Sequence, residues 1–242
     1  MLSKNEIKDI QSLSQKKFRD ELKLFITEGP KIVGELIELI PHQIEKIYAI
    51  EEWMKNRKSS VQTIEMIEIS SVELAKLSQL QTPNQVVAII RKKESKKPDA
   101  SLFTLYLDTI QDPGNFGTIL RIADWFGIKD IVCSSGCVDL YNPKVIQSTM
   151  ASVARVNVFY DENDEWLRHQ TVPIFAATLK GTILYEHEKT KEGVLIIGNE
   201  SKGIRSEILQ SAKEKVTIPK KGGADSLNAA VATGIILSHL LE

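Results

Sequence analysis

The sequence predicts an α/β protein built in two parts, and three observations support this prediction. Short apolar runs alternate with stretches of helical periodicity along the chain. A basic segment at 91–99, in which Pro98 is the only apolar residue, interrupts the alternation. The second series predicts a mostly parallel sheet with helices on both faces, because parallel neighbours are joined by helical crossovers.

The first part reads as a small α/β domain. Pro30 suits the first turn of a helix that carries its apolar residues on one face. Glu73, close after Ser70 and Ser71, is typical of a capped helix start. We expect helices at 3–19, 30–40, 51–58 and 71–80, and strands at 24–29, 46–50, 64–69 and 86–90.

The segment 91–99 is the predicted boundary. Five of its nine residues are basic, which is typical of a solvated linker. A linker that also touches phosphate is the alternative. We therefore predict a domain at 1–95, a linker at 96–100 and a second domain at 101–242.

The second part repeats the alternation. In a sheet whose strands alternate with helices along the chain, ligands bind in the loops at the carboxyl ends of the strands. We expect strands at 102–107, 130–133, 156–159, 173–176, 194–197 and 215–218, and helices at 116–126, 143–150, 163–169, 203–211 and 226–240.

Composition and charge disfavour several classes of protein. A net charge of −1 and an aromatic content of 6% argue against nucleic-acid binding through bulk charge or many stacked rings, so any such contact must come from local patches. The two cysteines, Cys133 and Cys137, cannot complete a zinc site with the scattered histidines, and we expect them reduced and structural, with no metal bound. No apolar run is long enough for a leader or a membrane span, so we expect a soluble, cytoplasmic protein.

The first loop of the second part combines a turn with a displayed arginine. Asp-Pro-Gly-Asn at 112–115 has the composition of a tight turn. The helix after it carries Arg121 on the same face as Gly117 and Asp124. A fixed guanidinium there could hold a phosphate or a carboxylate through two bonds. A surface pair with Asp124 is the alternative.

The second loop follows strand 194–197. Gly198 and Gly203 bracket a polar turn, and glycine lets the backbone come close to a ligand. The spacing matches neither a dinucleotide-binding loop nor a Walker loop. Glu200 could face a cationic ligand or anchor an arginine, or it could simply lie near a helix start that favours negative charge.

The third loop follows strand 215–218 and leads into a helix rich in alanine. Ser226 could cap this helix with help from Asp225. Asn228 is predicted inside the first turn, where its side chain would be free to hold a ligand.

In this order, the three loops resemble the three motifs of the SpoU–TrmH group of SPOUT methyltransferases. The matching stretches are DPGNFGTILR at 112–121, IGNESKGI at 197–204 and IPKKGGADSLNAAVA at 218–232. The stretch 148–156 also resembles a segment of the family, with Ala151 where the family usually has glycine. Residues 25–29 resemble part of the family's appended substrate-binding domain, a small α/β fold akin to RNA-binding ribosomal proteins.

The resemblance implies a deep trefoil knot in the carboxyl-terminal sheet and a homodimer that packs through it. It also implies S-adenosylmethionine as the cofactor. The implied cofactor-binding residues are Thr178, Leu179, Gly198, Asn199, Glu200, Gly203, Ile218, Pro219, Ser226, Leu227 and Asn228.

The family assigns activation of a ribose hydroxyl to the arginine that matches Arg121, which would act as a base or orient the hydroxyl and a phosphate. Asn115 would position Arg121 or the ribose, and Glu200 would organise the loops. Ser226 and Asn228 would fix the third loop.

The implied function is 2′-O-methylation of a ribose in structured RNA, with rRNA favoured over tRNA. The alternatives are a non-catalytic RNA-binding protein with a vestigial site, and a methyltransferase that acts on a base or a protein. The full set of implied catalytic residues argues against a vestigial site.

Overall fold

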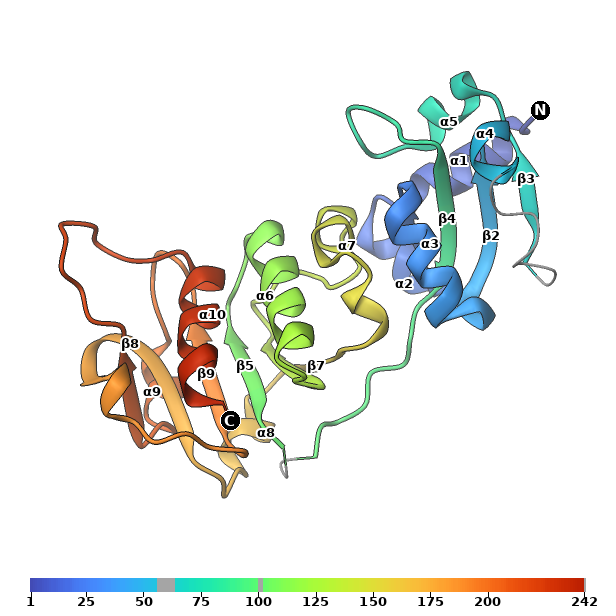
Figure 1. The fold of residues 1–242 in the computed structure, drawn as a ribbon. Helices are drawn as coiled ribbons and strands as arrows, with labels where there is room; N and C mark the ends of the chain where they lie inside the picture. The colour runs from blue at the N-terminus through green and yellow to red at the C-terminus, as the bar shows by residue number, and fades with distance from the viewer. Residues whose placement is uncertain (56–63, 100–101, 242) are drawn as a thin grey trace. The chain divides into compact units, whose positions relative to one another are not determined.

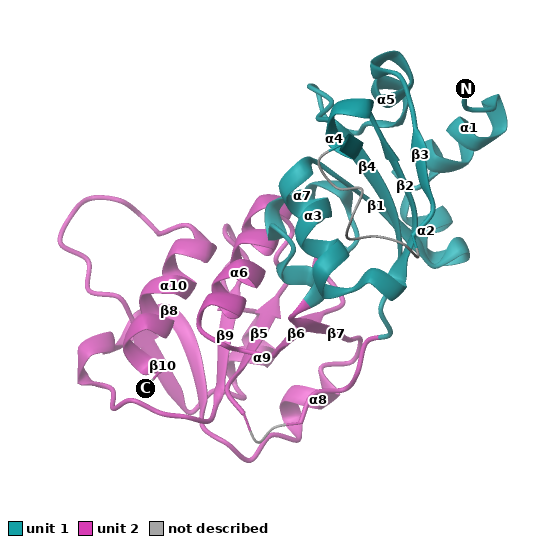
Figure 2. Cartoon of the chain, turned by 45° about the vertical axis from the view of Figure 1, so that its right-hand side comes forward, with its two compact units in different colours: residues 1–94, 139–154 teal, residues 95–138, 155–242 magenta. Residues whose placement is uncertain are grey.

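The computed structural model describes residues 1–55, 64–99 and 102–241. The chain forms two compact units, shown in different colours in Figure 2. Unit 1 comprises 1–94 and 139–154, and unit 2 comprises 95–138 and 155–242. The predicted linker at 96–100 lies close to the first division between the units. The main difference is that residues 139–154, which were expected in the second domain, belong to unit 1.

A four-stranded sheet organises unit 1. Its strands, in spatial order, are β1 (Leu24–Glu28), β4 (Val86–Arg91), β2 (Ile44–Ala49) and β3 (Met66–Glu68). β4 runs antiparallel to both of its neighbours, whereas β2 and β3 are parallel. The first five residues of β4 are buried, as expected for a central strand.

Helices cover the sheet of unit 1 (Figure 1). They are α1 (Lys4–Ser12), α2 (Lys16–Leu22), α3 (Pro30–Leu39), α4 (Glu51–Lys55), α5 (Ser71–Leu77) and α7 (Pro143–Thr149), with short 3₁₀ turns at Pro41–Gln43 and Ser152–Ala154. Residues of α1 and α5 join Ile26, Val87 and Ile89 of the strands in one apolar cluster. The last three positions of the helix expected at 51–58 lie outside the described residues.

The single helix expected at 3–19 is wrong, because the chain turns between α1 and α2. The buried Arg19 side chain reaches back and donates to the carbonyl oxygens of Leu13 at 2.9 Å and Ser14 at 2.8 Å. A continuous helix would use the Leu13 and Ser14 carbonyls in its own hydrogen bonds. Here the Arg19 guanidinium, in place of backbone amides, donates to both carbonyls and so stabilises the break between α1 and α2.

Segment 139–154 packs within unit 1, although the sequence pattern places its helix in the second series. Arg19 forms an ion pair with Asp139 at 2.6 Å, and the Tyr141 ring lies 4.8 Å from the ring of Phe25 in β1. After α7 the buried Ala151 has φ of +70°. This left-handed conformation explains why glycine suits the position, since an L-residue there costs about 1–2 kcal/mol.

Unit 2 contains a six-stranded sheet in which every pairing is parallel. Its strands, in spatial order, are β10 (Glu214–Thr217), β8 (Ile174–Ile183), β9 (Val194–Gly198), β5 (Thr104–Asp108), β6 (Asp130–Ser134) and β7 (Asn157–Asp161). The mostly parallel sheet predicted from the sequence is confirmed. Parallel strands end at the same edge, so the loops after β5, β9 and β10 share that edge.

Helices lie on both faces of this sheet. Tyr106 and Ile196 point to the face covered by α8 (Glu165–Arg168) and α9 (Ser206–Leu209). Alternate residues of each strand point to the other face, where α6 (Pro113–Trp125) and α10 (Ala229–Leu240) pack side by side (Figure 1). A 3₁₀ turn, Leu184–Glu186, follows β8.

Candidate active site

Unit 2 contains a cavity of about 890 Å³ at the ends of β8, β9 and β10. Three chain segments supply most of its lining: 177–180, 197–204 and the stretch from Lys215 to Ile236 in α10, with Leu209 of α9 as a further contact. Ten of the eleven predicted cofactor-binding residues are in its wall: Thr178, Leu179, Gly198, Asn199, Glu200, Gly203, Ile218, Pro219, Ser226 and Leu227. Asn228, the eleventh, does not line the cavity, and neither do Asn115 and Arg121.

Asn199 closes the loop that follows β9. Its backbone exchanges two hydrogen bonds with Gly203, at 3.0 and 2.9 Å, and its side-chain oxygen accepts from the amides of Ser201 and Lys202. Its side-chain nitrogen donates to the carbonyl of Thr109 at 2.8 Å, which ties this loop to the loop after β5. Asn199 therefore sets the shape of the cavity wall.

Gly198 is required by close packing within the same loop. A Cβ atom there would lie 2.5 Å from the carbonyl carbon of Gly203 and 2.5 Å from the amide of Ile204. Gly203 has φ of +72°, a conformation that glycine adopts without strain. The two bracketing glycines thus serve a tight self-contacting turn. Of the helix expected at 203–211, the structure has only the short helix α9.

Asn115 joins the loops that the sequence pattern singled out. It lies in the first turn of α6, where Asp112 accepts a hydrogen bond from its backbone amide at 2.7 Å. Its side-chain nitrogen donates to Glu200 at 2.8 Å, and its side-chain oxygen accepts from Asn228 at 2.7 Å. Asn115 and Asn228 therefore reach the cavity indirectly, through Glu200 in its wall.

The placement of Asn228 inside a helix is wrong. α10 begins at Ala229, and Asn228 is its N-cap, accepting from the amides of Ala230 at 2.9 Å and Val231 at 3.2 Å. Ser226 precedes the cap, is exposed and lines the cavity. An N-cap asparagine uses its oxygen for the helix and keeps its nitrogen free for another partner, here Asn115.

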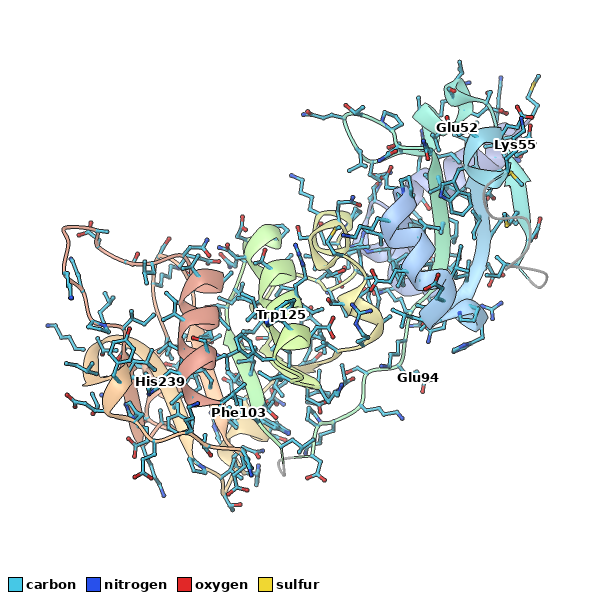
Figure 3. All side chains as sticks on the ribbon, in the orientation of Figure 1. Glu52, Lys55, Glu94, Phe103, Trp125 and His239 are labelled. Atoms are coloured by element: carbon cyan, nitrogen blue, oxygen red, sulfur yellow. The ribbon has the colours of Figure 1, made fainter. Side chains whose placement is uncertain are left out.

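Arg121 is exposed on α6 and forms no hydrogen bond or ion pair with any residue that the structure describes. The alternative of a surface pair with Asp124 is wrong, because Arg155 donates to Asp124 at 2.7 Å. Trp125, one turn further along α6 and labelled in Figure 3, is 86% exposed. The structure leaves Arg121 available to an outside ligand.

A buried ionic network supports the second loop, and the sequence analysis missed it. Arg205 donates to Asp108 through its backbone amide and through Nε, both at 2.7 Å, and to Asp164 at 2.9 Å. Tyr106 donates to the same Asp164 oxygen at 2.6 Å. Asp108 is fully buried at the end of β5. The network therefore fixes the position of Arg205, which directly follows Ile204 in the cavity wall.

The ionisation of this network follows from its surroundings. Burial alone would lower the pKa of Arg205, but the hydrogen bonds to Asp164 and Asp108 outweigh it and raise the pKa above its ordinary value. Burial, together with the hydrogen bond to Asp164, raises the pKa of Tyr106. Arg205 therefore stays a cation and Tyr106 a neutral donor near neutral pH.

The two cysteines are free thiols beside the loop after β5. The Cys137 thiol donates to the carbonyl of Leu107 at 3.1 Å, and Cys133 is fully buried in β6. Burial and the neighbouring Cys137 raise the pKa of Cys133, whereas the hydrogen bond from Cys133 lowers that of Cys137. Within the described residues, no three His, Cys, Asp or Glu side chains gather as a metal site would require, and no helix has the length and apolarity to span a membrane.

Two family patterns match this chain. Residues 102–238 match the SpoU rRNA Methylase family, and residues 4–88 match the MRM3-like substrate binding domain. The chain belongs to the SpoU rRNA methylase family. One relative in this family is the 23S rRNA guanosine 2′-O-methyltransferase RlmP of Bacillus subtilis, which is 31% identical over 98% of this chain and 97% of that protein.

Solved structures of similar proteins agree with this membership. A Porphyromonas gingivalis protein, assigned to the TrmH family of RNA methyltransferases, is 35% identical with a TM-score of 0.89, covering 100% of this chain and 98% of that one. An AdoMet-bound rRNA methyltransferase from Sinorhizobium meliloti is 30% identical with a TM-score of 0.85, covering 100% and 97%. The SpoU family, the parallel α/β fold and the methyltransferase class predicted from the sequence are confirmed.

Proposed function

We propose that this SpoU methylase transfers a methyl group from S-adenosylmethionine to the 2′-hydroxyl of a ribose in rRNA. The observation that carries the proposal is the cavity in unit 2, whose walls come from the second and third loops. Hydrogen bonds from Asn115 to Glu200 and from Asn228 to Asn115 bring the first loop to the same place.

The residues around the cavity fit S-adenosylmethionine. The volume of about 890 Å³ lies within the roughly 300–1,000 Å³ of small-molecule sites. Leu179, Ile218 and Leu227 supply apolar wall for the adenine, and Glu200 supplies a carboxylate for the cationic groups. When bound, the cofactor supplies an electrophilic methyl group that needs no metal.

Arg121 is the candidate catalytic residue. Its guanidinium is exposed and without a partner among the described residues, so it is available to an RNA phosphate and to the ribose hydroxyl. An arginine is almost always protonated, so we assign it the orientation of the hydroxyl and the stabilisation of negative charge as the hydroxyl proton leaves. Asn115, Glu200, Ser226 and Asn228 are proposed to hold the loops around the reacting groups.

The test is methylation of unmodified rRNA with labelled cofactor, followed by digestion to nucleosides. We expect a labelled 2′-O-methylnucleoside, and we expect Arg121→Ala to abolish it while cofactor affinity in calorimetry stays within about twofold. Arg168→Ala, which removes another exposed arginine of unit 2, is the matched control. A labelled base or protein would indicate the other methyltransferase class, and failure to bind the cofactor would indicate a vestigial site.

The choice of rRNA rests on the relatives and on the first hundred residues. RlmP acts on 23S rRNA, and residues 4–88 match a substrate binding domain. We propose that residues 1–95 bind RNA, that 96–100 link the parts and that 101–242 carry the chemistry. Comparing methylation of rRNA and tRNA by the full chain separates the two substrates.

A homodimer, a trefoil knot in the carboxyl-terminal sheet and a cytoplasmic location complete the proposal. Support for a dimer comes from exposed apolar side chains on unit 2, among them Trp125, Tyr185 and Val231. Sedimentation equilibrium of the full chain tests the dimer. A monomer at micromolar concentration would contradict it.

A further inference from the structure

Lysines are concentrated around the cavity of unit 2. Its wall holds five lysines and two carboxylates, Glu200 and Asp225. The lysines are Lys180, Lys202, Lys215, Lys220 and Lys221. By contrast, residues 101–242 contain 14 Lys and Arg against 17 Asp and Glu. These five lysines form a positively charged rim around the cavity, although this half of the chain is acidic overall. The rim therefore suggests a ligand with negative charge.

The ammonium groups of these lysines form no ion pairs within the part of the chain that the structure describes. All five lysines are exposed. They come from three segments: β8, the loop after β9, and β10 with the loop that follows it. Like charges gathered without partners repel one another, and a bound anion would relieve this repulsion.

The cofactor is a poor candidate for that anion. S-adenosylmethionine carries a sulfonium, an ammonium and a carboxylate group, and therefore one net positive charge. A ligand with a net positive charge does not account for five lysine ammonium groups around its binding site. A polyanion is the ligand that suits the rim, and RNA carries one phosphate per nucleotide.

We propose that Lys202, Lys220 and Lys221 bind backbone phosphates of the RNA next to the nucleotide that is methylated. The inference rests on the proposed function for the identity of the polyanion. Lys220 and Lys221 lie between Pro219 and Gly222 in the loop before α10, and Lys202 lies in the loop that carries Glu200. Phosphates held by these lysines would direct the neighbouring ribose towards the cavity.

Salt dependence measures this contact directly. Each lysine that neutralises a phosphate on single-stranded RNA contributes about 0.7 to the slope of log affinity against log salt. We expect the triple variant K202A/K220A/K221A to lower the slope by about 2 on a 20-nucleotide polyuridine. Affinity at low salt should fall at least tenfold, whereas affinity for S-adenosylmethionine should stay unchanged or rise.

Two matched variants isolate the effect. K129A/K189A/K213A removes three exposed lysines of unit 2 that do not line the cavity, and should leave the slope within experimental error. K202R/K220R/K221R keeps the charges and should retain most of the slope. Circular dichroism melting should be similar for all four proteins.

The outcomes separate this inference from the proposed function. A slope that is unchanged in the alanine triple variant, or that falls equally in the control, overturns it. A loss of cofactor affinity without a change of slope also overturns it, because the lysines would then hold the cofactor carboxylate. A reduced slope in a protein that forms no 2′-O-methylnucleoside would leave the phosphate contact standing while the proposed function fails.

Discussion

The Asn228 side chain donates to the side-chain oxygen of Asn115 at 2.7 Å, although 113 positions separate the two residues. The Asn115 nitrogen in turn donates to Glu200 at 2.8 Å. The side-chain amide of Asn115 thus joins the loops after β5, β9 and β10. Its nitrogen donates to the Glu200 carboxylate, and its oxygen accepts from the Asn228 amide. Only a side chain with both functions at this length satisfies both partners.

Asn115→Asp should therefore disrupt the junction of the three loops. The new carboxylate faces the carboxylate of Glu200 in place of an amide donor, and like charges at this distance repel. We expect methyl transfer to fall at least 100-fold, with the melting temperature lowered by only a few degrees. Steady-state kinetics and thermal melting measure the two effects.

Gln111→Glu is the matched control for this substitution. It introduces the same charge at an exposed position just before α6, and should retain nearly full activity. If the two variants were equally active, the Asn115 bridge would not contribute to the site.

Gly198→Ala should weaken cofactor binding strongly, because the added Cβ would collide with backbone atoms of Gly203 and Ile204 at 2.5 Å. Backbone atoms cannot rotate away as a flexible side chain can, so the 199–203 turn must open. Calorimetry with S-adenosylmethionine should show an affinity loss of at least 50-fold.

Gly222→Ala is the corresponding control. Gly222 also lines the cavity, but a Cβ there would meet nothing within 4 Å. Its cofactor affinity should stay within about threefold of the parent protein. Similar losses in both variants would mean that the cavity, and not the close contact at Gly198, is sensitive to an added methyl.

The sequence predicted most elements of unit 2 because strands such as β5, β6 and β9 are short, mostly buried runs. The beginning of α10 shows where such reasoning fails. Both Ser226 and Asn228 have a side chain able to cap a helix, and local pattern favoured the serine. The distant Asn115, which accepts from Asn228, lies outside any local pattern around the helix start.

Long-range polar contacts were beyond prediction for the same reason. Arg205 and Asp108 are 97 positions apart, and Tyr106 and Asp164 are 58 apart. Neither pair has a repeating spacing that a sequence pattern could reveal. The Arg19 contacts that split the first helix are shorter in range, but the Asp139 that holds this side chain is 120 positions away.

Glu73 should titrate with a pKa of about 2, well below its ordinary value. The backbone amides of Ser70 and Leu2, followed by the Ser70 hydroxyl, stabilise its carboxylate at the start of α5. A lowered folded-state pKa contributes stability above the unfolded-state pKa, and this contribution is lost as pH falls from about 4.5 towards 2. NMR titration of the carboxyl carbon checks the value directly.

Glu73→Gln should consequently make the free energy of unfolding fall less steeply as the pH is lowered from about 4.5 towards 2. The difference in unfolding free energy between parent and variant should be largest at neutral pH and shrink towards pH 2. Glu21→Gln, which removes an exposed carboxylate of unit 1, is the comparison. A Glu73 that titrated near 4.5 would contradict the capping role.

Arg205→Ala should destabilise the protein by about 3–5 kcal/mol, because it leaves a buried carboxylate without its charged partner. Asp108 is fully buried and would keep only the backbone amide of residue 205. Arg205→Lys should lose less, since it keeps the charge but cannot bond Asp108 and Asp164 together. Urea unfolding measures the change, with Arg168→Ala as the exposed control, which should lose less than 0.5 kcal/mol.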